Sequence, residues 1–261
     1  VPQIVERAHP TPADLRDRAA ALGIDLPVDG AVEVDGPLAR PFTTVDGSAG
    51  ELSVGNRWTI LPMEGWDGTA DGLPTDLVRR RWRRFGASGA KLIWGGEAVA
   101  VEPAGRANPH QLTITNGAAE ALAGLRAELT DAHRAAHGSV DGLVVGLQLT
   151  HSGRWSRPGG EPAPRTAWTH PALDARLGID RTAVLADDEL DLLADRYVEA
   201  ARIAADAGYA FVDVKHCHGY LLHELLAATG RPGRYGGSLE GRLRFLSTVV
   251  ERIRAARPDL A

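Results

Sequence analysis

Residues 210–224 read AFVDVKHCHGYLLHE, and they join a strand-like run to a cluster of reactive side chains. The apolar run from Ala210 to Val214 predicts a buried strand, and a helix-forming segment follows the cluster. Three of the nine histidines and the only cysteine of the chain fall in this stretch. Ionisable side chains at the carboxyl end of a parallel strand are typical of the active sites of α/β enzymes.

The same order of strand and then helix recurs along the chain. Apolar runs predict strands at 57–61, 90–94, 143–149 and 210–214, and helical patterns follow at 75–85, 116–133, 187–207 and 238–256. Asn116 is expected to cap the second of these helices. Almost continuously apolar strands indicate a parallel sheet covered by helices, either an eight-stranded barrel or an open doubly wound sheet. No Gly-x-Gly-x-x-Gly follows the first strand, which disfavours a dinucleotide-binding fold.

Two further segments stand apart from this pattern. Residues 1–36 are expected to form an N-terminal extension, in which Thr11 caps a helix that Pro12 opens and Gly23 ends. Residues 42–45 and 51–54 predict a hairpin around an Asp-Gly turn. After the third strand, residues 151–186 are rich in Pro, Arg and Trp, and they predict a long loop of the kind that often forms a functional lid.

The composition excludes several classes of protein. At 261 residues, 44% apolar and 24% charged, the chain is an ordinary globular protein, and its net charge of -5 argues against a nucleic-acid partner. A single cysteine excludes a disulfide framework, an iron–sulfur cluster and a Cys-type zinc site. No membrane-spanning run or signal peptide is apparent, so a cytoplasmic location is expected. A homo-oligomer remains open as an alternative to a monomer.

Polar side chains follow all four predicted strands, where the carboxyl ends of a parallel sheet converge. They are Glu64, Glu97, Gln148, His151, Lys215 and His218. Asp213 and Lys215 lie two residues apart on one strand and therefore face the same way, so Asp213 is expected to keep Lys215 protonated. A plain buried ion pair is the alternative.

A metal site is the other interpretation of this stretch, because imidazole and thiolate ligands suit zinc. However, His216 and Cys217 are adjacent and point apart on a strand, and no His-x-x-x-His spacing occurs. No metal site is therefore predicted, and His216 and Cys217 are expected to have packing roles, although a metal-dependent barrel hydrolase stays as an alternative. Tyr220 is equally suited to donate a proton and to form an aromatic wall.

Taken together, these motifs resemble the old yellow enzyme family of NADH:flavin oxidoreductases, which are FMN-dependent (β/α)8 barrels. The likeness rests on residues 55–63 (GNRWTILPM), 97–106 (EAVAVEPAGR), 148–154 (QLTHSGR), 208–222 and 234–242 (RYGGSLEGR). The last of these is the most specific. The resemblance implies that residues 37–261 form the N-terminal half of a TIM barrel, with about its first four βα units.

The resemblance also implies a function, namely hydride transfer from NADH or NADPH through FMN to an unsaturated carbonyl or carboxyl compound, as in ene-reductases. The residues that would line the flavin are Pro62, Met63, Glu64, Ala98 and Gln148. The amide of Gln148 would hydrogen-bond the pyrimidine edge of the ring. Tyr220 would protonate the small-molecule substrate, and Lys215 and His218 would hold its carbonyl oxygen.

Three features depart from the family pattern. Lys215 replaces a histidine, and an ammonium there favours a carboxylate over a neutral enone. Glu64 stands where many members have Thr or Cys, and it would disfavour anionic reduced flavin unless it is turned away. The sequence ends at Ala261, before the strands that would supply an Arg beside the flavin and the phosphate site. More polypeptide beyond Ala261 is the favoured explanation; completion by a partner chain and a non-catalytic half-barrel module are the alternatives.

Overall fold

A computed structural model of the chain describes residues 11–31, 33–44 and 51–261, and it divides into two compact units, Val1–Arg40 and Pro41–Ala261. The first unit contains helix α1 (Pro12–Ala21). Thr11 caps this helix as the sequence predicted, because its Oγ accepts a hydrogen bond from the Asp14 amide at 3.1 Å and Asp14 accepts one from the Thr11 amide at 3.0 Å. Gly23 follows the helix with a left-handed φ of 70°.

In the second unit, five strands of the described residues form a parallel sheet. They are β3 (Thr59–Ile60), β4 (Leu92–Ile93), β5 (Ala98–Ala100), β6 (Val144–Thr150) and β7 (Phe211–Val214). Strand β4 pairs with the start of β6, and β5 pairs with its end. These two short strands therefore occupy one position in the sheet, with a break at Gly95 and Gly96.

The break explains why the sequence predicted β4 but not β5. Gly95 has a left-handed φ of 86°, and a Cβ atom there would lie 2.8 Å from the amide nitrogen of Gln148. Only glycine therefore allows the chain to turn this close to β6. Strand β5 has only three residues, which is too short to show a period in the sequence.

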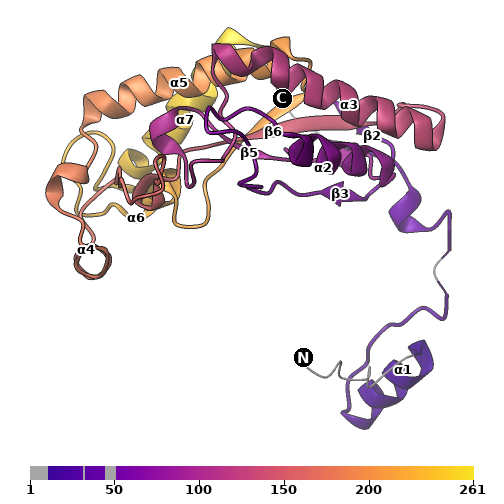
Figure 1. The fold of residues 1–261 in the computed structure, drawn as a ribbon. Helices are drawn as coiled ribbons and strands as arrows, with labels where there is room; N and C mark the ends of the chain where they lie inside the picture. Colours follow the sequence, from indigo (N-terminus) through magenta and orange to yellow (C-terminus); the bar gives the residue numbers. More distant parts are fainter. Residues whose placement is uncertain (1–10, 32, 45–50) are drawn as a thin grey trace. The chain divides into compact units, whose positions relative to one another are not determined.

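Helices cover one face of the sheet, and a small hairpin packs against the other. The helices are α2 (Asp76–Ala87), α3 (Ala119–His137), α5 (Asp187–Asp206) and α7 (Leu239–Ala256). Figure 1 shows α3 and α5 lying along one side of β6. The strands alternate accordingly: Ile93 and Val145 belong to the large core, whereas Leu92 and Val144 pack on the opposite face with the hairpin of β1 (Phe42–Thr44) and β2 (Leu52–Val54). The predicted Asp-Gly turn lies outside the described residues.

Two expectations about local structure need correction. Helix α3 begins at Ala119 after a 3-10 turn at Asn116–Ala118, so Asn116 is not its capping residue. Residues 151–186 are not a plain loop, because they contain helix α4 (Pro171–Leu177) and 3-10 turns at Gly153–Trp155 and Arg181–Ala183. Helix α6 (Leu221–Ala227) follows β7. Within the described ranges, none of the helices is both long and apolar enough to cross a membrane.

The outer edge of β7 is paired at its start by the last residue of the chain. The Ala261 amide donates to the Ala210 carbonyl at 3.3 Å, and the Val212 amide donates to the Ala261 carbonyl at 3.0 Å. This alternation on two residues of β7 is the pattern of a parallel neighbour. An apolar cavity of about 400 Å³ lies beside it, lined by β7 and by α7 residues such as Leu246 and Val250.

A buried histidine between α2 and α3 should make the fold sensitive to acid. His133 is fully buried, donates from Nδ1 to the Gly86 carbonyl at 2.8 Å, and accepts at Nε2 from the Lys91 ammonium at 2.9 Å. Burial lowers the pKa of His133, and the charge of Lys91 lowers it further. Stability is therefore complete above the unfolded pKa of about 6.5 and is lost as the pH falls through the lower folded pKa.

We expect thermal melts to show a loss on the order of 1 kcal/mol below about pH 6. His133→Gln has no titrating group and should flatten this slope, whereas replacing the exposed His110 by Gln should leave it. Identical slopes in the two variants would contradict the assignment.

Candidate active site

Four residues lie side by side in one row across the sheet, near the carboxyl ends of its strands: Met63, Ala98, Gln148 and Asp213. The Ala98 amide donates to the Met63 carbonyl at 3.1 Å, Ala98 is in register with Gln148, and Gln148 is in register with Asp213. Parallel strands place their carboxyl ends on one side, which is where ligands bind in α/β folds. The sheet therefore brings together residues that lie far apart in the sequence.

Asp213 interacts with Gln148 and not with Lys215. The Gln148 side chain is 7% exposed, and its Nε2 donates to Asp213 Oδ2 at 2.6 Å. The expectation that Asp213 is the partner of Lys215 is therefore wrong. Strand alternation alone suggested the pair, but the Gln148 amide is the partner of Asp213, and Lys215 Nζ donates to Glu64 Oε1 at 2.9 Å.

Glu64 is the centre of the site. Its Oε1 accepts from Lys215 Nζ at 2.9 Å, and its Oε2 accepts from the Tyr220 hydroxyl at 2.8 Å and from Trp66 Nε1 at 3.2 Å. The side chains of Lys215 and Glu64 are only 7% and 9% exposed. One carboxylate thus neutralises the ammonium and orients the phenol.

Tyr220 is held in its protonated form. Burial raises the pKa of the Tyr220 phenol, and the nearby charge of Glu64 and the hydrogen bond to it raise the pKa further. The residue lies directly before α6, and Lys215 Nζ lies 4.3 Å from the centre of its ring. A neutral phenol beside a buried ion pair can donate a proton, so the geometry is compatible with the predicted acid role of Tyr220.

His218 is an exposed residue that lines a cavity together with Tyr220. It has a left-handed φ of 60°, and its Nδ1 lies 3.4 Å from Cys217 Sγ. His218 and Tyr220 line the same cavity of about 430 Å³, and Lys215 is not among its lining residues. No hydrogen bond joins the two expected anchors in the described structure; Lys215 Nζ instead donates to Glu64.

Cys217 and His216, the two residues before His218, differ in their exposure. Cys217 is exposed, so its expected packing role is wrong. His216 is half-buried; burial lowers its pKa, and the nearby His223 lowers it further. In the part of the chain that is described, no three His, Cys, Asp or Glu side chains are arranged to hold a metal ion. The arrangement thus offers nothing specific to the metal-hydrolase alternative.

Glu97 is a buried residue that stabilises the loop next to the site. Its carboxylate is 1% exposed and accepts from Arg81 Nη2 at 2.8 Å and from the Gly65 amide at 2.7 Å. Arg81 also binds Asp67 through both terminal nitrogens, at 2.6 and 2.9 Å. Glu97 therefore fixes the loop that carries Glu64 and Trp66, and this structural role explains the carboxylate that the sequence places after the second strand.

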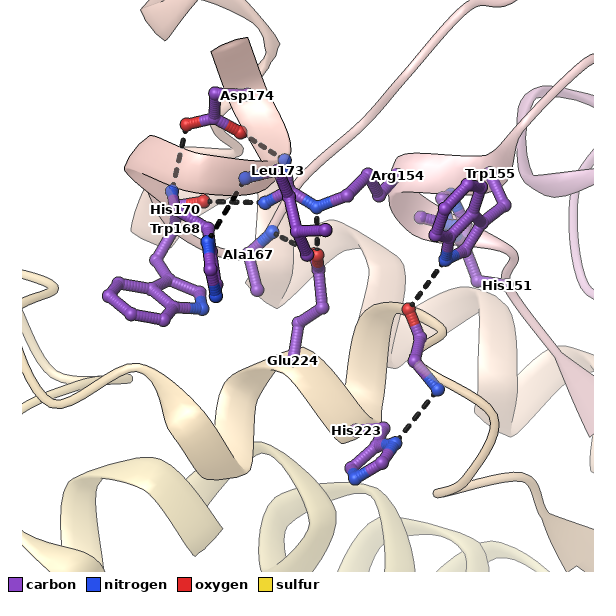
Figure 2. A network of polar contacts seen from close by, with 12 residues as sticks. His151, Arg154, Trp155, Ala167, Trp168, His170, Leu173, Asp174, His223 and Glu224 are labelled. Atoms are coloured by element: carbon purple, nitrogen blue, oxygen red, sulfur yellow. Dashed lines mark hydrogen bonds and ion pairs between the residues drawn. The ribbon is translucent and has the colours of Figure 1, made fainter. Parts of the chain in front are cut away.

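A buried arginine ties residues 151–186 to helix α6 (Figure 2). The Arg154 side chain has no exposed surface, and it donates to Glu224, to Asp174 and, at 3.1 Å, to the Trp168 carbonyl. Glu224 also accepts from the Ala167 amide at 3.2 Å. This network links the turn after β6, helix α4 and helix α6, and thereby positions Tyr220 at the start of α6.

The residues that the resemblance assigns to a flavin fit such a ring in their chemistry. Gln148 offers an amide, which both donates and accepts, at the buried end of β6. Ala98 presents a small side chain in the neighbouring row position, and Met63 has an apolar side chain that is 67% exposed. An apolar surface next to one amide suits a flat heteroaromatic ring, so the chemistry of these residues is compatible with FMN.

A parallel βα sheet with polar groups at the carboxyl ends of its strands occurs in (β/α)8-barrel enzymes and in doubly wound enzymes, and the match to a barrel family decides between them. The family model described as "NADH:flavin oxidoreductase / NADH oxidase family" matches residues 48–257, and the chain belongs to this family. The recognition of old yellow enzyme motifs in the sequence is thereby confirmed.

Two curated relatives are both named NADPH dehydrogenase. The NADPH dehydrogenase of Geobacillus sp. (strain WCH70) is 32% identical over 210 residues, which are 78% of this chain and 56% of that protein. The NADPH dehydrogenase of Bacillus velezensis (strain DSM 23117 / BGSC 10A6 / LMG 26770 / FZB42) is 28% identical over 83% of this chain and 60% of its own length. The chain therefore spans somewhat more than half the length of these relatives.

Solved structures agree on the barrel. The old yellow enzyme homologue from Zymomonas mobilis superimposes with a TM-score of 0.66 at 28% identity, over 84% of this chain and 60% of that one. Morphinone reductase gives a TM-score of 0.62 at 26% identity, over 84% and 58%. The predicted fold, a TIM barrel of which this chain covers part, is confirmed.

Proposed function

We propose that the protein is an FMN-dependent oxidoreductase that takes hydride from NADH or NADPH and passes it to an unsaturated carbonyl or carboxyl compound. Residues 37–261 supply the first four βα units of its barrel, and residues 1–36 form an extension. A nicotinamide reductant suits a cytoplasmic location. Family membership, the NADPH dehydrogenase activity after which the relatives are named, and the chemical fit of Gln148, Ala98 and Met63 to a flavin ring support this proposal.

The observation that carries the proposal is the pair of donors joined by Glu64. Bound FMN supplies the hydride chemistry. Tyr220 holds a proton on a phenol whose pKa is raised, and its hydroxyl is oriented by Glu64 at 2.8 Å. Lys215 Nζ lies 4.3 Å from the centre of the Tyr220 ring and His218 lines the same cavity as Tyr220, so both provide hydrogen-bond donors for the oxygen of the substrate. Tyr220 then gives its proton to the substrate carbon next to the carbonyl group.

Tyr220→Phe tests this assignment. We expect the full-length variant to accept electrons from NADPH as the parent does, but to lose roughly 100- to 10,000-fold in the rate of substrate reduction, because a positioned acid contributes about that much. Stopped-flow measurement of the two half-reactions separates these effects. Tyr235→Phe, which removes a hydroxyl bonded to Asp191 outside the site, is the control. Equal effects of both variants on substrate reduction would sink the assignment.

A further inference from the structure

The cavity beside Tyr220 has a composition that the proposed chemistry does not require. Its volume is about 430 Å³, enough for a small organic molecule. Trp66 and Trp155 line it together with His218 and Tyr220, and Arg157 and Asn108 lie in the same wall. No aspartate or glutamate is among the described residues that line it. The cavity is therefore aromatic and has positive charge without a compensating carboxylate in its lining.

The two tryptophans present large indole surfaces to this space. Trp66 is 51% exposed and Trp155 is 39% exposed, although tryptophan usually buries its ring. Each ring is nevertheless fixed, because Trp66 Nε1 donates to Glu64 Oε2 and Trp155 Nε1 donates to the Gly219 carbonyl, both at 3.2 Å. Figure 2 shows the second of these bonds at the start of α6. Fixed, exposed aromatic faces are suited to stack on a flat ligand.

Backbone strain gathers at the same cavity. Among the described residues, Trp66 and His218 are the non-glycine positions with a left-handed φ, at 49° and 60°, and both line this space. Such conformations are uncommon for residues with a Cβ atom and persist where the surroundings enforce them, often at ligand sites. The bond from Gly65 to Glu97 and the bond from Trp66 to Glu64 hold the first of the two in place.

Arg157 gives the cavity its charge. It is exposed, and its side chain makes no hydrogen bond or ion pair with another residue of the described structure. Its backbone is fixed, since its amide donates to the Arg106 carbonyl at 2.8 Å and its carbonyl accepts from the Gly160 amide at 3.1 Å. Lys215, in contrast, is already neutralised by Glu64 at 2.9 Å. Arg157 is thus the cation of this cavity that has no carboxylate partner in the described structure.

We propose that this cavity is a specificity subsite for a planar, conjugated ligand that carries a carboxylate. The flat part would lie against Trp66 and Trp155, and Arg157 would bind the carboxylate, for which its planar guanidinium is suited. The inference rests on the proposed function only in that the ligand would be the substrate. It shifts the selection of negative charge from Lys215, where the sequence suggested it, to Arg157.

The test is calorimetric binding to the full-length protein as purified, with three probes of similar size. Cinnamate is planar and anionic, cinnamamide is planar and neutral, and 3-cyclohexylpropanoate is anionic but not planar. We expect cinnamate to bind about tenfold more tightly than either of the others. Arg157→Gln should remove the preference over cinnamamide. Trp66→Leu and Trp155→Leu should each reduce the preference over 3-cyclohexylpropanoate, and the corresponding Phe variants should retain most of it.

Matched controls lie elsewhere on the chain. Arg84→Gln removes an exposed arginine of α2, and Trp58→Leu removes a tryptophan that is 54% exposed, and neither residue lines this cavity. Equal affinity for the three probes, or equal effects of the Arg157 and Arg84 variants, would overturn the inference. Because binding is measured without turnover, a flavin-free protein that still prefers cinnamate would refute the proposed function alone. A NADPH-reducible flavoprotein without the preference would refute the subsite alone.

Discussion

Arg154→Met is expected to destabilise the protein by about 3–5 kcal/mol, because it leaves the buried carboxylates of Glu224 and Asp174 without their shared cation. The guanidinium of Arg154 has no exposed surface, and the Glu224 and Asp174 side chains are only 7% and 13% exposed. Burial by itself raises the pKa of Glu224, and Arg154 opposes this shift more strongly than the Ala167 amide does. Urea unfolding monitored by circular dichroism would measure the loss.

A surface pair provides the control for this prediction. Arg134→Met breaks an ion pair with Asp131 whose partners are 53% and 73% exposed, and we expect a loss below about 1 kcal/mol. Adding Glu224→Gln and Asp174→Asn to Arg154→Met should recover part of the loss, because the unpaired charges are removed. If Arg154→Met and Arg134→Met proved equally mild, the network would not hold residues 151–186 to α6.

Glu64→Gln should have the second largest effect, because it removes the counter-ion of a nearly buried ammonium. We expect a loss of about 3 kcal/mol in the free energy of unfolding, and Lys215→Met in the same chain should restore much of it. The double-mutant cycle isolates the coupling between the two residues. An exposed pair, Glu240 and Arg244, is the reference and should couple by only about 0.3–0.5 kcal/mol.

The same variant has a second readout at Tyr220. The charge of Glu64 is one of the causes that raise the pKa of Tyr220, with burial the larger one. Removing the charge should therefore lower the pKa of the phenol, and the alkaline limit of substrate reduction should move to lower pH. A coupling energy as small as that of the surface pair, together with an unchanged pH limit, would show that Glu64 does not organise Lys215 and Tyr220.

The sequence predicted the strands well because buried parallel strands are continuous apolar runs. It missed β5, since three residues after a double glycine show no period. It also predicted that Glu64, Lys215 and Tyr220 belong to one site, but it did not predict which of these side chains bind each other. Asp213 looked like the partner of Lys215 from strand alternation alone, whereas the actual partner, Glu64, is 151 positions away in the chain.

Side-chain networks that join distant parts of the chain could not be predicted either, because no local pattern marks such partners. Arg154, Asp174 and Glu224 lie on three separate elements, and an arginine in a loop rich in Pro and Arg carries no local sign that it will be fully buried. The two-tryptophan cavity was equally hidden, because Trp66 and Trp155 come from the ends of different strands. The sequence does contain one hint, because both tryptophans follow predicted strand ends that carry polar residues.

The visible absorption spectrum of the full-length protein shows whether this chain belongs to a flavoprotein. We expect a yellow protein that releases FMN on denaturation and whose flavin absorption is bleached by NADH or NADPH under anaerobic conditions. A colourless protein that cannot be loaded with FMN would contradict this expectation.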